Sequence, residues 1–99
     1  MLKKSYSKTG KICRVTFKLP AEVGAETAVL CGDFNAWSAE ENPMKKLKDG
    51  SFSATVSLAA PDKAYRFRYF LDGERWENDW EADQYLPNSH GEEDSVVTV

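Results

Sequence analysis

Apolar and polar residues alternate one by one along much of this chain, and this period of two constrains its fold more than any other feature. In Ser51–Leu58 the alternation is complete: Phe, Ala, Val and Leu take turns with Ser and Thr. Segments 12–19 and 64–71 repeat the pattern. Because successive side chains of a strand point to opposite faces, each segment is predicted to be a strand with one buried face. Shorter strands are expected at 27–32 and 95–99.

These strands are separated by turn signals rather than by helices. Asp49-Gly50 and Asp72-Gly73 are typical of hairpin turns. Residues 39–47 are too few for a stable helix and are interrupted by Pro43. The pattern therefore predicts an all-β fold, an antiparallel β-sandwich, with long loops at 33–44 and 76–94.

Ninety-nine residues suit one domain, so residues 1–99 are interpreted as a single β-sandwich, with 1–10 as a flexible or edge segment. The alternation assigns Arg66, Arg68 and Phe70 to the outer face of strand 64–71. Tyr65, Phe67, Tyr69 and Leu71 share the other face. Four aromatic residues are expected in the core: Phe34, Tyr65, Phe67 and Tyr69.

Two tryptophans, Trp37 and Trp76, lie in polar, turn-rich sequence, and an indole at the surface usually contacts a ligand or partner. Two alternatives stay open: Trp37 as a core plug beneath its own loop, and Trp76 buried beside its turn. Trp80 is expected to have a packing role. The alternative for Arg68 is a solvated arginine paired with one of three nearby acids, Asp72, Glu74 or Asp79.

Composition narrows the classes of function. A net charge of −3 disfavours nucleic acid as a partner, and the absence of an apolar run near the N-terminus disfavours a membrane partner and predicts a cytoplasmic protein. Cys13 and Cys31 are expected as small buried hydrophobes, although a disulfide between neighbouring strands remains open. Lone His90 gives neither a metal site nor a triad, and the acidic run 72–83 implies neither a calcium loop nor a glycosidase. No cofactor is expected.

Taken in order, the motifs resemble the family-48 carbohydrate-binding modules. The resemblance is carried by Gly-Asp-Phe-Asn-Ala-Trp at 32–37, Asp-Gly-Ser-Phe at 49–52, the aromatic strand Tyr-Arg-Phe-Arg-Tyr at 65–69, and Leu-Asp-Gly followed by Trp76. It covers about residues 15–99. That family includes the glycogen-binding domain of the AMP-activated protein kinase β subunit and the N-terminal domains of isoamylases and branching enzymes. It implies an early-set, immunoglobulin-like sandwich that binds α-1,4-linked glucans without a cofactor.

The resemblance also implies a set of sugar contacts. Trp37, Arg68 and Trp76 match the family's positions, with arginine where the kinase subunits carry lysine. In the closing loop, Glu92 stands where those subunits have threonine and Asp94 where they have asparagine. One extra residue, Arg75, precedes Trp76.

Two hypotheses follow. The first is a non-catalytic module that binds glycogen or starch-type α-1,4-glucans and that could serve a glycogen-metabolising enzyme or kinase-like partner. The chemistry agrees, because a glucosyl ring has an apolar C–H face that a flat indole fits and hydroxyl groups that charged side chains bind. The alternative is a protein–protein interaction or scaffolding module that has lost or altered sugar binding.

Overall fold

The computed structural model describes residues 2–99, and within them every regular element is a strand or a single 3-10 turn. The strands are β1 (Leu2–Tyr6), β2 (Ile12–Leu19), β3 (Ala28–Gly32), β4 (Lys45–Lys46), β5 (Phe52–Ala59), β6 (Ala64–Leu71), β7 (Arg75–Glu77), β8 (Gln84–Pro87) and β9 (Glu93–Thr98). The 3-10 turns are η1 (Ala21–Val23) and η2 (Asp33–Asn35).

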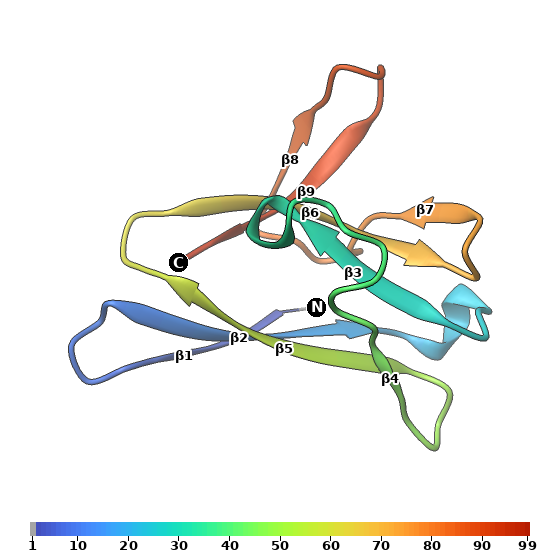
Figure 1. Cartoon of the computed structure of the whole chain (residues 1–99), viewed down its shortest axis with the longest axis horizontal. Helices are drawn as coiled ribbons and strands as arrows, with labels where there is room; N and C mark the ends of the chain where they lie inside the picture. The colour runs from blue at the N-terminus through green and yellow to red at the C-terminus, as the bar shows by residue number, and fades with distance from the viewer. Residues whose placement is uncertain (1) are drawn as a thin grey trace.

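The strands form two antiparallel sheets that pack face to face (Figure 1). The first sheet has the order β1-β2-β5-β4, and the second has the order β3-β6-β9-β8, with β7 also paired to β6. This confirms the predicted all-β sandwich. The five expected strands are all present; β2 and β6 have the expected ends, and the ends of the other three differ by one or two residues.

The core lies between the sheets and follows the alternation. In β2 the four residues Cys13, Val15, Phe17 and Leu19 are all buried, and β6 buries Phe67, Tyr69 and Leu71. Edge-to-face aromatic contacts link the two sheets, with ring centres of Phe17 and Phe67 4.9 Å apart. The remaining predicted core residues, Phe34 and Tyr65, are partly buried and pack against this cluster.

The prediction of one continuous loop at 76–94 was wrong, because the segment contains β7 and β8. β7 pairs with the C-terminal half of β6, and β8 pairs with β9. These strands have three and four residues in charged sequence, so no period of two can show in them. They form because β6 and β9 offer unpaired backbone groups that a neighbouring segment satisfies.

The segment before β2 forms the edge strand β1, which pairs with β2 along its length; Met1 lies outside the described residues. Lys4 of β1 makes an ion pair of 2.6 Å with Asp83, which precedes β8. The long connection between β7 and β8 is thereby tied to the first sheet.

The same connection is anchored by a buried carboxylate. Asp79 is 1% exposed and accepts a hydrogen bond of 2.7 Å from the hydroxyl of Tyr69. Its backbone amide donates to Ser95 Oγ at 2.9 Å. Burial, together with the neighbouring carboxylate of Asp79, raises the pKa of Tyr69 well above its ordinary value, so the phenol stays protonated and donates.

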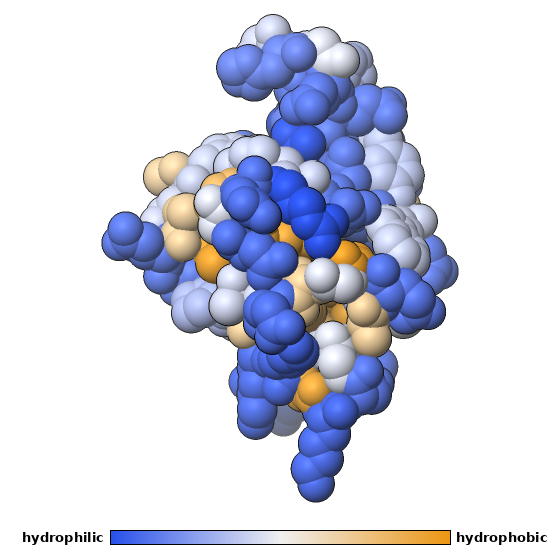
Figure 2. Space-filling model, turned by 90° about the vertical axis from the view of Figure 1, so that its right-hand side faces the viewer, coloured by the Kyte–Doolittle hydropathy of each residue, from blue (hydrophilic) through white to orange (hydrophobic). Residues whose placement is uncertain are grey.

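Cys13 and Cys31 are both buried and free, as the hydrophobe interpretation predicted, and the possible disulfide is absent. Within residues 2–99 no helix has the length and apolar character needed to cross a membrane. Figure 2 shows the side of the sandwich that lies on the right in Figure 1. This side is mostly hydrophilic, with small apolar patches between hydrophilic side chains. At the top of this view a projecting segment overhangs a hollow.

Candidate functional site

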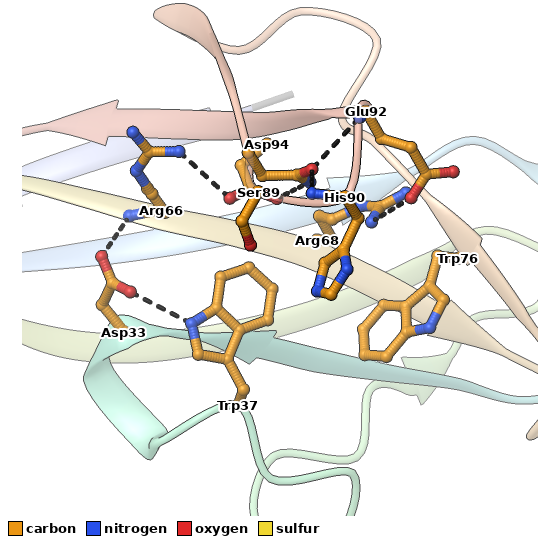
Figure 3. A pocket seen from close by; sticks show the side chains of 10 residues that line it. Asp33, Trp37, Arg66, Arg68, Trp76, Ser89, His90, Glu92 and Asp94 are labelled. Atoms are coloured by element: carbon orange, nitrogen blue, oxygen red, sulfur yellow. Dashed lines mark hydrogen bonds and ion pairs between the residues drawn. The ribbon is translucent and has the colours of Figure 1, made fainter.

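A cleft of about 560 Å³ opens on the outer face of the second sheet (Figure 3). Three parts of the chain form it: the η2 turn, the outward side chains of β6 and β7, and the tip of the β8–β9 hairpin. Its lining residues are Asp33, Trp37, Arg66, Arg68, Trp76, Asn88, Ser89, His90, Glu92 and Asp94. All five sequence-predicted site residues are therefore brought together here.

Trp37 is positioned by a tightly built turn. Asn35 clamps it, since its side chain accepts from the Gly32 amide at 3.0 Å and donates to the Leu30 carbonyl at 2.9 Å. Trp37 itself has φ 58°, a left-handed conformation that is uncommon for a bulky residue and concentrates at functional sites. Its indole Nε1 donates to Asp33 Oδ1 at 3.0 Å, which fixes the ring.

Asp33 also ties this turn to β6, because its second oxygen accepts from the Arg66 amide at 2.9 Å. The indole of Trp37 is half-buried and lines the cleft, so the core-plug alternative was wrong.

Trp76 lies in β7, directly opposite Phe70 of β6. The two rings stack with their centres 4.5 Å apart and their planes at 37°. The remaining surface of the indole is open, with 42% of the residue exposed, so the buried alternative was wrong. The extra residue before it, Arg75, takes the first position of β7 and donates to the Val23 carbonyl.

The two indoles meet at an angle. Their ring centres are 6.4 Å apart, and their planes make an angle of 64°. They therefore form a concave aromatic wall rather than one flat platform.

Arg68 lies beside this wall, with its guanidinium carbon 5.6 Å from the ring centre of Trp76. Its side chain is only 13% exposed, and its Nη1 pairs with Glu92 Oε1 at 3.2 Å. The alternative partners proposed from the sequence, three acids in the chain segment after β6, were wrong. Its Nε is buried and makes no hydrogen bond within residues 2–99.

Asp94 lies at the base of the hairpin and is buried. Its carboxylate accepts from Arg66 Nη1 at 3.3 Å and from Asn88 Nδ2 at 3.1 Å. Asn88 in turn accepts from the amides of His90 and Glu92. Asp94 thus shapes the hairpin tip that carries Glu92, in addition to lining the cleft.

His90, to which the sequence analysis assigned no role, lines the cleft, and its imidazole is seen between the two indoles in the view of Figure 3. It sits at the turn of the β8–β9 hairpin, before Gly91 with φ 78°. No motif marks it; only knowledge of the β8–β9 pairing places it over the cleft.

The prediction of a packing role for Trp80 was also wrong. This residue is 53% exposed, because the turn that carries it is held by Asp79 and directs the indole outward. Among residues 2–99, no group of three or more His, Cys, Asp or Glu side chains could hold a metal ion.

A cleft that combines aromatic rings with a few polar side chains is typical of ligand-binding sites, and the protein therefore has the features of a β-sandwich ligand-binding module. Residues 5–86 match the family model described as carbohydrate-binding module 48, the isoamylase N-terminal domain. The chain belongs to this family of carbohydrate-binding modules. The match ends before the hairpin tip at residues 88–92, so this wall of the cleft lies outside the matched region.

Proposed function

We propose that this protein is a non-catalytic module that binds α-1,4-linked glucans of the glycogen or starch type in the cleft of Trp37 and Trp76. The observation that carries the proposal is the pair of indoles set at 64° beside Arg68. An α-1,4-linked glucan curves, so consecutive glucosyl rings present their C–H faces in different directions. Two flat rings at an angle match such a chain better than two coplanar rings.

The polar groups of the cleft supply what the hydroxyl rim of a sugar needs. The guanidinium of Arg68 lines the cleft and is paired with the carboxylate of Glu92, which is mostly exposed. Each indole offers roughly 100 Å² of apolar surface, which corresponds to about 5 kcal/mol for both at 25 cal/mol per Å². Ordering the glucan offsets part of this gain, so the expected Kd is roughly micromolar to millimolar.

The carboxylates of the cleft support binding rather than hydrolysis. Glycoside hydrolysis needs one carboxylic acid and one carboxylate free to act on opposite sides of a sugar bond. Here Asp33, Glu92 and Asp94 are each engaged by a donor of the protein itself. The proposal is therefore a binding module without catalytic activity.

Titration with maltoheptaose, followed by amide and indole NMR shifts, tests the proposal. We expect saturable shifts at Trp37 and Trp76 and none with cellohexaose, whose β-1,4 linkage makes a straight chain. Absence of shifts at millimolar maltoheptaose, or equal shifts with both sugars, would overturn the assignment to α-1,4-glucans.

Four expectations from the sequence stay predictions: residues 1–99 as one domain, a cytoplasmic location, a glycogen-metabolising or kinase-like partner, and the alternative of a protein-interaction module. The alternative predicts that an affinity-captured partner is retained regardless of added glucan, whereas the glucan-binding proposal predicts retention on amylose resin and elution by maltoheptaose.

A further inference from the structure

We infer that Trp80 forms a second glucan-binding surface, separate from the cleft, so that one molecule can hold two glucan segments. The inference takes its class of ligand from the proposed function. Trp80 belongs neither to the cleft nor to the core, so its exposed indole has no role in the proposed function as stated above.

The exposure of Trp80 is the first observation. At 53% it is the most exposed large hydrophobic side chain of the described residues 2–99, and it is absent from the cleft lining. A large aromatic side chain that is exposed to water often marks a surface that binds a ligand or partner.

The second observation is that the ring is held in place. Its Nε1 donates to Glu77 Oε2 at 2.9 Å, as Trp37 donates to the carboxylate of Asp33 four residues earlier. The turn beneath it is anchored by the buried Asp79, whose Oδ1 accepts from the Glu81 amide at 2.7 Å. A ring fixed before binding loses little freedom when a ligand arrives.

The third observation is the set of polar groups at the ring. Arg75 and Glu77 form an ion pair of 3.9 Å, and Glu77 contacts the Trp80 indole. The cleft uses the same combination, because Trp76 lies beside the ion pair of Arg68 and Glu92. An indole with a carboxylate and a guanidinium provides an apolar face for the sugar ring, together with acceptors and donors for its hydroxyls.

Trp80 lies outside the cleft, and the groups around it come from the other side of β7. In β7, Arg75 and Glu77 alternate with Trp76 and so point away from the face that carries the cleft. The turn with Trp80 leads to Asp83, which pairs with Lys4 of β1. The second surface therefore lies on the flank between β7 and β1.

Two separate weak sites suit a branched polysaccharide. Such a ligand presents many chain segments, and engaging two of them raises the apparent affinity without any new contact. A short oligosaccharide gains nothing from the second site.

The test follows the indole Nε1–H signals of the three tryptophans during titration with maltoheptaose, in the wild type and in Trp76→Ala. We expect the Trp80 signal to shift and saturate in both proteins, because its site does not use the cleft. Shifts of Trp37 and Trp76 without Trp80 would overturn this inference and leave the proposed function standing. A shift of Trp80 alone would retain the second surface and overturn the cleft assignment, and no shift at all would overturn both.

Co-sedimentation with glycogen gives a second readout. Trp80→Ala is expected to weaken retention by about tenfold or more, because two linked sites bind more tightly than either site alone. Ile12→Ala is the matched control, since Ile12 is 45% exposed on the outer face of β2, outside the cleft and outside the flank between β7 and β1, and should have no effect. Equal retention of the two variants would contradict a second glucan site.

Discussion

Replacing Trp76 by alanine should weaken glucan binding strongly while leaving the fold intact. The substitution removes an indole that is 42% exposed and stacked on Phe70. Loss of roughly 100 Å² of apolar contact with the sugar corresponds to about 2.5 kcal/mol, or about a sixtyfold rise in Kd. Loss of the aromatic pair with Phe70 costs the protein only about 1 kcal/mol of stability, because the ring lies at the surface.

The assay is an NMR or calorimetric titration with maltoheptaose, with the free energy of unfolding measured in urea to confirm that the variant is folded. Trp76→Phe is the matched control, since it keeps a smaller flat ring against Phe70 and should lose about threefold to tenfold in affinity. A Kd for Trp76→Ala within twofold of the wild type would refute the role assigned to this indole.

Three further predictions concern the elements that support the site. The backbone amides of Thr27 and Glu26 donate to the carboxylate of Asp72 and lower its pKa in the folded protein. The carboxylate therefore stabilises the fold above about pH 4, the ordinary pKa of an unfolded Asp, and this stabilisation is lost as the pH falls through the lower pKa of the folded state. Asp72→Asn, which tolerates the left-handed φ of 54°, should therefore show a smaller loss of unfolding free energy between pH 7 and pH 2.5; an unchanged acid dependence would contradict this. Tyr69→Phe removes a donor from the buried Asp79 and should cost about 1–3 kcal/mol in urea unfolding, whereas a neutral effect would show that this bond is not needed. Gly32→Ala would place a Cβ 2.6 Å from the Arg66 carbonyl oxygen, so thermal unfolding should reveal a loss of about 2 kcal/mol or more, and an unchanged Tm would disprove the close approach.

The sequence predicted the parts of the fold that depend on burial. The alternation in β6 assigned Phe67 and Tyr69 to the core and Arg68 to the outer face, and the structure confirms all three. Burial acts on every second residue of a long strand, so it leaves a pattern that can be counted.

The parts that depend on pairing between distant segments were not predictable in this way. β7 and β8 are too short to show a period, and they exist because β6 and β9 offer open edges. The partner of Arg68 is Glu92, 24 residues away, and only the β8–β9 hairpin brings it close. Trp80 was misassigned because the buried Asp79, which directs the indole outward, is one charge among many in an acidic run.

The most direct test of the central claim is a crystal structure of the protein with bound maltoheptaose. We predict glucosyl rings stacked on both Trp37 and Trp76, with Arg68 or Glu92 within hydrogen-bond distance of sugar hydroxyls. A complex in which the sugar contacts neither indole, or in which both rings remain uncovered at saturating sugar, would contradict the account.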